Sequence, residues 1–535
     1  MKKFLLSALA LTMLVGCSSG GEATSTTDSG TSTSGTKSVM IATDTDILSM
    51  NSSTSTDGTS FVALTMCQAG LTQIDGSNVV QPDLAESWDV SDDGLEYTFH
   101  IREDAKWSDG TDLTANDFAY AWDRLIAPET ASEYAFLIDK TAETNTANVK
   151  DWEVVDDKTF KVTLSLPCDF FLSLCAFPSL FPLNEEYTEA QGDQYALSCD
   201  NMIYCGPYKM VEWTSNTSWK FVKNDQYWDA ASYADKVDEA SWRVVQGQSA
   251  ILDYQAGNID YVKLTSEVID DYAGQDDIVT SLSGYAWFLS LNFHNEYLAN
   301  ENIRKAIAYA INTEEMCNSV LKDGSTPLEG IVTKSTTANA DGEDFRDISG
   351  TVVLGYDEDK AKEYFEKGCE ELGVDSISLE FLYEDSDVSK NVAAYVMAAL
   401  EKVGFSTEAK CEPKKSRIQD MQNDNYTVAL HRWGPDYADP QTYMDLFITG
   451  ASNNYGHYES NTYDELINKA LTTDAADSTQ RWADFAEAEK ILVSDEVAVV
   501  PLYQSGSTAL QNTKLTGIEY HGAGVDNYRH MILAD

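Results

Sequence analysis

The chain has 535 residues and a formal net charge of −52 at pH 7, with 88 acidic and 36 basic side chains. This charge argues against nucleic acid as a partner, because phosphate binding requires concentrated Lys and Arg. An acidic surface is typical of a soluble exported protein, and attraction for cationic substrates is the alternative interpretation. The length is too great for a single hydrophobic core and predicts two or three domains.

The N-terminal residues predict export and attachment to a lipid. After a Met-Lys-Lys start, Phe4 to Val15 is an apolar run too short to span a bilayer permanently. The run ends in Leu-Val-Gly-Cys17, which resembles the lipobox of bacterial lipoproteins. The resemblance implies cleavage before Cys17 and acylation of that cysteine, with residues 1–17 as the signal peptide; a plain secretory signal is the alternative. Residues 18–38 are almost entirely small or polar and predict a flexible tether.

Cysteine and histidine spacing gives no sign of a metal site. No C-x-x-C occurs, and the six histidines have no close pair along the chain. Eight of the nine cysteines follow Cys17. Two pairs, Cys168 with Cys175 and Cys199 with Cys205, are near enough in sequence to form disulfides in an oxidising compartment. In an anaerobic host the same cysteines would stay reduced and buried, and the sequence leaves both possibilities open.

The first half of the chain predicts mostly strands. Residues 95–101 alternate, with Leu95, Tyr97, Phe99 and Ile101 on one face, after a turn at Ser91 to Gly94. Thr114 is the expected N-cap of a helix that runs from Ala115 to about Leu125. Further strands are expected at 39–42, 160–166, 206–213 and 219–222.

The second half predicts helices alternating with strands. Residues 286–293 alternate as a strand, and 303–311 follow the i, i+3, i+4, i+7 spacing of an amphipathic helix. Helices of the same kind are expected around 361–365, 392–400, 463–471 and 482–492, before an apolar strand at 497–502. The pattern predicts a mixed α/β protein without a short internal repeat.

One candidate binding loop follows a predicted strand that ends near His431. Gly434 and Pro435 stop the strand, because proline cannot donate to the ladder. Asp436 comes next, with Trp433 and Tyr437 on either side. A carboxylate between two aromatic residues could hold a cation, or Asp436 could be an ordinary turn residue.

Motifs for catalysis and cofactor binding are missing from the sequence. It contains no G-x-S-x-G elbow, no H-E-x-x-H, no P-loop and no dinucleotide-binding glycine fingerprint. The acidic pairs, such as Asp92-Asp93, occur in turns where solvated carboxylates are common. We therefore predict no enzyme activity, no cofactor and no metal.

Several blocks together carry a resemblance to a known family. They are A-E-S-W-D-V-S-D-D-G-L-E-Y-T-F-H-I-R-E-D-A-K-W-S-D-G within residues 84–130, and then C-G-P-Y-K-M-V-E-W, N-I-R-K-A-I-A-Y-A-I-N and R-W-G-P-D-Y-A-D-P further along. In this order they resemble the bacterial extracellular solute-binding proteins of family 5, the OppA-like oligopeptide- and dipeptide-binding proteins of ABC importers. The resemblance covers essentially the whole mature chain.

The resemblance implies a two-lobed α/β fold like that of periplasmic binding proteins (type II, large cluster C). Lobe I would comprise residues 39–75, 190–282 and 498–535, with 76–189 as an extra subdomain. Lobe II would comprise residues 283–497. Hinge closure of the lobes around the ligand is the expected motion.

It also implies the site residues and the partners. Asp436 would pair with the α-ammonium group of a peptide and Trp433 would line the cleft, with Tyr437 and Arg432 as further ligand-binding candidates. The resemblance does not identify the residues that bind the ligand carboxylate. Lys414, Lys415, Arg417 and Arg432 are candidates only by proximity in sequence, and ordinary surface charge is the alternative interpretation for most of them. The expected partners are an oligopeptide, the permease subunits of an ABC importer, and the outer face of the bacterial cell membrane through the lipid on Cys17.

The protein is expected to be a monomer. Two alternatives remain: the same fold binding another solute, such as an oligosaccharide or a metal chelate, and a surface-anchored hydrolase.

Overall fold

The computed structural model describes residues 35–142, 145–337 and 343–535. The predicted signal peptide, Cys17 and most of the predicted tether lie outside these residues. Residues Lys37–Asp535 form one folded unit. Among the residues described, no helix combines the length and the apolar character needed to cross a membrane.

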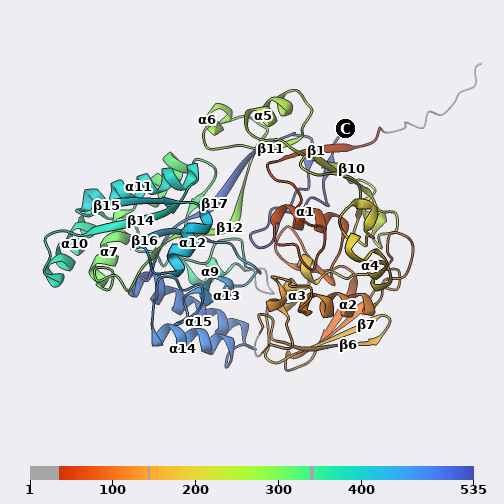
Figure 1. The fold of residues 1–535 in the computed structure, drawn as a ribbon, viewed down its shortest axis with the longest axis horizontal. Helices are drawn as coiled ribbons and strands as arrows, with labels where there is room; N and C mark the ends of the chain where they lie inside the picture. Colours follow the sequence, from red (N-terminus) through yellow and green to blue (C-terminus); the bar gives the residue numbers. More distant parts are fainter. Residues whose placement is uncertain (1–34, 143–144, 338–342) are drawn as a thin grey trace, which may run out of the picture. The chain divides into compact units, whose positions relative to one another are not determined.

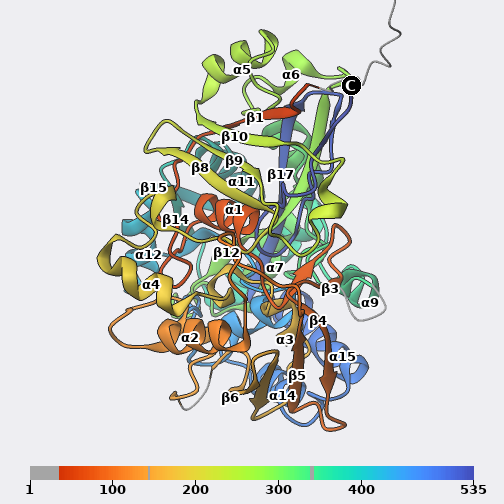
Figure 2. The ribbon, with the colours of Figure 1, turned by 90° about the vertical axis from the view of Figure 1, so that its right-hand side faces the viewer.

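An 11-stranded mixed sheet runs through this unit and contains strands from both halves of the chain (Figure 1). Its strands in spatial order are β15 (Ser406–Glu412), β14 (Ser378–Glu384), β16 (Val428–Trp433), β12 (Ile278–Leu291), β17 (Val499–Gln511), β11 (Tyr261–Lys263), β1 (Ser38–Thr43), β10 (Glu239–Val244), β9 (Ser218–Lys223) and β8 (Tyr208–Thr214), with β13 (Thr326–Pro327) paired to β17. The two longest strands, β12 and β17, run side by side (Figure 2). They pair antiparallel, with register shifts between Leu282 and Ala286 and between Trp287 and Phe288. They connect the strands of the first half of the chain to those of the second half.

A separate four-stranded antiparallel sheet has the order β4 (Ala85–Val90), β5 (Glu96–Ile101), β7 (Thr159–Leu164) and β6 (Val149–Asp156). The predicted alternation is confirmed, since Tyr97, Phe99 and Ile101 on β5 are buried. Helix α2 (Ala115–Ile126) begins after Thr114 as predicted, because Thr114 and Asp117 form a capping box. Two short ribbons pair β2 (Thr72–Ile74) with β3 (Val80–Pro82), and β18 (Leu515–Thr516) with β19 (Ile532–Leu533).

Two hydrophobic cores lie on opposite sides of β12. One contains Trp287, Leu289 and Leu291 of this strand together with α7 (Glu301–Ala310), α10 (Glu358–Leu372) and α11 (Asp387–Val403). The other contains Ala286 and Phe288 together with α13 (Gln441–Met444), α14 (Asn461–Leu471) and α15 (Ser478–Lys490). The alternation of β12 thus places helices on both faces of this part of the sheet, as the predicted α/β class requires.

The largest core gathers residues from 39 to 261 and adds side chains from much later in the chain, among them Tyr528 and Met531. Arg529 is buried in the same region and donates to Asp83 Oδ2 at 3.2 Å. The remaining helices are α1 (Gly58–Cys67), α3 (Phe171–Leu174), α4 (Glu185–Gln191), α5 (Gly247–Gln255), α6 (Ile269–Tyr272), α8 (Thr313–Met316), α9 (Phe345–Ser349) and α12 (Lys414–Gln422).

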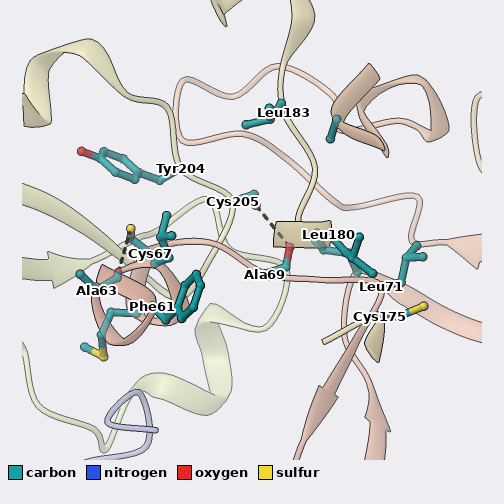
Figure 3. Close-up of a cluster of buried hydrophobic side chains, with 14 of the residues drawn as sticks. Phe61, Ala63, Cys67, Ala69, Leu71, Cys175, Leu180, Leu183, Tyr204 and Cys205 are labelled. Carbon is teal, nitrogen blue, oxygen red and sulfur yellow. Dashed lines mark hydrogen bonds between the residues drawn. The ribbon is translucent and has the colours of Figure 1, made fainter. Parts of the chain in front are cut away.

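The eight cysteines that the structure describes are all free. Neither Cys168 with Cys175 nor Cys199 with Cys205 forms a disulfide, so of the two alternatives the structure has the reduced one. Figure 3 shows how the buried thiols are accommodated: Cys67 Sγ donates to the carbonyl of Ala63 at 3.3 Å. Cys205 Sγ lies 3.1 Å from Gln68 Oε1.

Candidate functional site

The loop after β16 is shaped by its glycine and proline residues. A Cβ atom on Gly434 would lie 2.5 Å from the ring of Tyr285, so glycine lets this partly exposed ring pack closely against the loop. The backbone N–H of Asp436 donates to Thr442 Oγ1 at 3.1 Å, and the Asp439 carboxylate accepts from the backbone N–H of Gln441 at 2.9 Å. These bonds fix the backbone that carries Asp436.

Asp439 attaches this loop to α15. Its two carboxylate oxygens accept from Nη1 and Nη2 of Arg481 at 2.7 and 2.8 Å, and both residues are buried. Arg481 also lies 3.7 Å from Asp169, which precedes α3. A bidentate pair of this kind is specific in geometry. Asp439 is therefore a structural residue of the loop.

Tyr437 attaches the other side of the loop to the largest core. Its ring stacks on Phe170 with centroids 4.2 Å apart and an interplanar angle of 11°. Tyr437 is buried and packs within that core. The phenol therefore lines the site as a fixed wall.

A cavity of about 520 Å³ opens beside Asp436. Its wall combines Thr56, the segments around Tyr134 and Thr146, the loop after β16, and residues from Thr442 to Asn453, which precede α14. The lining residues are Thr56, Glu133, Tyr134, Phe136, Thr146, Trp433, Asp436, Tyr437, Thr442, Asp445, Leu446, Ala451, Ser452 and Asn453. The volume lies in the range of pockets for small organic ligands.

The charged groups among these lining residues are all acidic: Glu133, Asp436 and Asp445. Within the described part of the chain, the Asp436 carboxylate has no hydrogen-bond or ion-pair partner, and burial raises its pKa to about 6. Burial also raises the pKa of Tyr134 to about 12, and the Asp436 charge adds to that effect. The cavity thus presents a carboxylate that still lacks a counter-ion, which is the condition for binding a cation.

Asp445 is a second under-satisfied carboxylate in the wall. Its Oδ2 accepts from Gln441 Nε2 at 2.9 Å, whereas its Oδ1 is buried without a hydrogen-bond partner among the described residues. Burial raises the pKa of Asp445 to about 7, although the Gln441 bond opposes the shift. A cationic ligand would relieve this desolvation as well.

Trp433 lines the same cavity from the end of β16. Its Nε1 is buried and has no hydrogen-bond partner in the part of the chain described. The neighbouring His431 does not add a charge, because burial and the nearby Arg417 and Arg432 lower its pKa to about 3. Trp433 therefore supplies an aromatic wall beside the carboxylates.

The remaining predicted residues lie elsewhere. Strand alternation places Arg432 on the other face of β16, with its guanidinium 5.0 Å from the centre of the Trp287 ring. Arg417 is buried, and its Nη1 lies 3.0 Å from His431 Nδ1. Lys414 and Lys415 are exposed on α12. The structure thus brings Asp436, Trp433 and Tyr437 together and leaves the four cationic candidates outside the cavity, while Cys17 lies outside the described residues.

Comparison with known proteins identifies the family. Residues 79–455 match the sequence profile of the bacterial extracellular solute-binding proteins, family 5. The chain belongs to this family. The dipeptide-binding protein DppE of Bacillus subtilis is 31% identical to it over 502 residues, which cover 92% of this chain and 91% of the relative.

Solved structures of similar proteins agree with the family 5 assignment. The substrate-binding domain of an oligopeptide ABC transporter from Bacillus anthracis is 34% identical, with a TM-score of 0.74 and coverage of 94% of this chain and 99% of the other. OppA of Listeria monocytogenes, solved with bound peptide, is 32% identical, with a TM-score of 0.73 and coverage of 94% and 100%. The predicted resemblance and the two-lobed α/β binding-protein fold are confirmed.

Sequence reasoning missed Glu133, Tyr134 and Asp445 in the cavity wall. A signal for Asp445 was present, because it is a lone charge inside the apolar run Y-M-D-L-F of residues 443–447. Such a charge must either be solvated or have a specific role. Glu133 and Tyr134 had no such signal, since only the tertiary fold brings them to the loop after β16.

Proposed function

We propose that this protein captures oligopeptides in the cavity beside Asp436 and delivers them to the permease of an ABC importer. The observation that carries the proposal is the Asp436 carboxylate, which lines a cavity of about 520 Å³ and has no partner among the described residues. Two relatives, a dipeptide-binding protein and an OppA solved with bound peptide, support the ligand class. The Bacillus anthracis relative is named as part of an oligopeptide ABC transporter, which supports the destination.

The α-ammonium group of the peptide is the cation that Asp436 would bind. A charge-assisted hydrogen bond in a closed site contributes about 1.5–3 kcal/mol. Every unblocked peptide carries this group, so the contact selects peptides without reading their sequence. The rest of the affinity would come from pairing with the peptide backbone and from side-chain pockets that tolerate water.

Trp433 and Tyr437 would act as walls on either side of the bound N-terminus. Both line the cavity, and Tyr437 is held by its stack on Phe170. Arg432 has no place in this proposal, because its guanidinium lies over the rings of Tyr285 and Trp287.

The proposed motion is closure of two lobes, with lobe I formed by residues 39–75, 190–282 and 498–535, the extra subdomain by 76–189, and lobe II by 283–497. The register shift between Leu282 and Ala286 on β12 lies where the chain would cross between lobes. A break in the ladder is a natural place for a hinge.

The proposed location is the outer face of the cell membrane, with a lipid on Cys17 as the anchor and the folded unit acting as a monomer without enzyme activity. The lipobox-like residues before Cys17 support the anchor. Mass spectrometry of the N-terminal peptide tests it: the parent should carry acyl chains and the Cys17→Ala variant should carry none. An unmodified Cys17 in membrane-extracted protein would contradict it.

Calorimetry with a mixed peptide pool and with the same pool after N-acetylation tests the ligand. We expect binding of the free pool and at least tenfold weaker binding of the acetylated pool. Equal binding of both pools would refute the role of Asp436, and binding of neither would redirect the search to oligosaccharides and chelates within the same family.

The variant Asp436→Ala should weaken peptide binding at least tenfold with little change in thermal stability. Glu459→Ala is the matched control, because Glu459 is an exposed carboxylate that does not line the cavity. A large loss of stability in Asp436→Ala would indicate that Asp436 is a turn residue instead.

A further inference from the structure

Three side chains with metal-binding chemistry meet beside the end of β12 and the start of β16, away from the cavity described above. His294 Nδ1 lies 2.9 Å from Asp424 Oδ2, and His457 Nε2 lies 3.6 Å from Asp424 Oδ1. One candidate ligand atom from each of the three residues lies within 4.8 Å of the others. Both imidazoles therefore direct a nitrogen toward the same carboxylate.

The backbone holds the three residues in place. His294 follows β12 and Asp424 precedes β16, and these strands are antiparallel neighbours that pair Leu291 with Val428. His457 is held near them through its neighbour Gly456, whose carbonyl accepts a hydrogen bond from the Phe293 N–H at 2.9 Å. A Cβ atom at residue 456 would lie 2.7 Å from the carbonyl oxygen of Leu291, so glycine allows this close approach.

Asn292 forms hydrogen bonds with both Asp424 and His294. Its Nδ2 donates to Asp424 Oδ1 at 2.6 Å and to the carbonyl of Tyr426 at 2.8 Å, while its Oδ1 accepts from the backbone N–H of His294 at 2.9 Å. Asn292 itself is buried. Hydrogen bonds of this kind orient the ligands of metal sites from the outer shell.

Backbone strain is concentrated at the same place. Asp424 and His457 both have left-handed backbone conformations, with φ of 61° and 55°. Non-glycine residues rarely adopt this conformation, and it is enriched where a site requires it. His457 Nε2 is also buried without a hydrogen-bond partner in the part of the chain described.

The rings of His294 and His457 lie side by side. Their centroids are 4.0 Å apart and their planes are 11° apart. Each ring has a nitrogen near the Asp424 carboxylate, so one ion placed between the three side chains would be close to all of them.

We propose that His294, Asp424 and His457 bind one divalent transition-metal ion of the zinc type. Imidazole nitrogens suit Zn²⁺ and its late first-row neighbours, and two His with one carboxylate are a common ligand set for them. Ligand distances of about 2.0–2.2 Å are within reach of the three groups after small side-chain adjustments. Three protein ligands leave a position for water, so the ion would remain accessible from the surface.

The histidines escaped the sequence search because they are far apart in the chain. Local spacing does not reveal the cluster, because His294 follows β12 whereas His457 lies in the loop before α14. The site does not depend on the proposed peptide binding. His457 does lie a few residues after the cavity-lining segment Ala451 to Asn453, so the ion would also restrain one wall of the cavity.

Titration of metal-free full-length protein with ZnCl₂ in a calorimeter tests the site. Cys411, which is exposed, is replaced by serine in every protein so that its thiol does not compete. The test variants are His294→Ala, Asp424→Asn and His457→Asn; asparagine tolerates the left-handed backbone at the last two positions. The matched control is His100→Ala, because His100 Nε2 lies 2.8 Å from Asp89 Oδ2 in an exposed pair that lacks a second histidine.

We expect one Zn²⁺ per chain, at least tenfold weaker binding in each test variant, and unchanged binding in His100→Ala. Zn²⁺ should also raise the melting temperature of the parent and of the control but not of the test variants. Melting curves without metal verify that each variant is folded, and three independent variants keep the test valid if one fails to fold. No zinc binding by the parent, or an equal loss in His100→Ala, would overturn the proposal.

Discussion

The rings of Phe170 and Tyr437 stack with their centroids 4.2 Å apart and their planes 11° apart. Phe170 belongs to the segment that precedes α3, and Tyr437 follows Asp436 in the loop after β16. The carboxylate proposed to bind the ligand is therefore next to a contact between two distant parts of the chain. Ligand binding and the packing of these parts should be coupled through Tyr437.

The first prediction concerns this stack. Phe170→Leu keeps an apolar side chain but removes an aromatic pair that contributes about 0.5–1.5 kcal/mol beyond its buried area. We expect peptide affinity to fall by about two- to tenfold, measured by calorimetry, since the stack would stabilise the ligand-binding arrangement. Tyr364→Leu is the control, because Tyr364 stacks on Tyr309 away from the cavity. Unchanged affinity in Phe170→Leu would show that the stack is independent of binding.

The second prediction concerns pH. The ionised form of Asp436 binds an ammonium group, and its pKa in the free protein is about 6. Affinity should therefore fall by about tenfold between pH 7 and pH 5, as the carboxylate is protonated. Asp445, with a pKa of about 7, should act in the same direction. In Asp436→Asn the remaining pH dependence should be shallower, and a slope identical to that of the parent would contradict the assignment.

Asp436 and Asp445 should affect the stability of the free protein in the opposite direction: their contribution to stability should fall as pH rises, whereas peptide affinity should increase. Their pKa values in the folded state lie above the value of about 3.9 for an unfolded aspartate. Their contribution to stability is full below that value and is lost as pH rises through 6 and 7. Urea unfolding at pH 5 and pH 7.5 measures this contribution. The free energy of unfolding of the double variant Asp436→Asn, Asp445→Asn, relative to that of the parent, should be higher at pH 7.5 than at pH 5.

The third prediction concerns ligand charge. The lining residues include Glu133, Asp436 and Asp445 and no basic side chain. A peptide with Lys near its N-terminus should bind on the order of tenfold more tightly than the same peptide with Glu, because like charges are costly in a partly desolvated site. Asp445→Asn should narrow this difference, whereas the exposed-site control Glu459→Gln should preserve it. Equal affinity of the parent for both peptides would refute the prediction.

The fourth prediction concerns the buried pair of Asp439 and Arg481. Arg481→Ala would leave a buried carboxylate without its bidentate partner, and breaking such a pair costs about 3–5 kcal/mol. Urea unfolding should show a loss of this size. Lys490→Ala is the control, because Lys490 and Asp495 form an exposed pair worth at most about 1 kcal/mol. Equal small losses in both variants would show that the buried pair does not hold the loop.

Local patterns in the sequence were sufficient for many elements of the fold. The alternation of Tyr97, Phe99 and Ile101 predicted β5, and Thr114 marked the start of α2, because each signal arises within one element. The loop with Asp436 could likewise be located, since Gly434 and Pro435 end a strand whatever packs around it. The position of Asp436 beside a cavity could not be predicted, because residues from other parts of the chain form the wall.

Local sequence patterns could not predict contacts between residues that are far apart in the chain. Glu133 reaches the cavity from a segment some three hundred residues before Asp436, and nothing in its neighbourhood indicates this. Arg432 illustrates the converse error: it is adjacent to Trp433 in sequence, but the two-residue period of a strand places it on the opposite face. The meeting of His294 and His457 could not be predicted either, because it depends on the hydrogen bond between Phe293 and Gly456, which are far apart in the chain.

The largest core has a consequence for the order of events during synthesis. Most of its residues come from the first half of the chain, yet Tyr528 and Met531 complete it and Arg529 supplies the counter-ion for buried Asp83. A nascent chain that has not yet produced these residues cannot close this core. The N-terminal half should therefore remain incompletely folded until nearly the whole polypeptide has been made. That delay would suit the proposed export, in which the chain is threaded through a translocation channel before it folds.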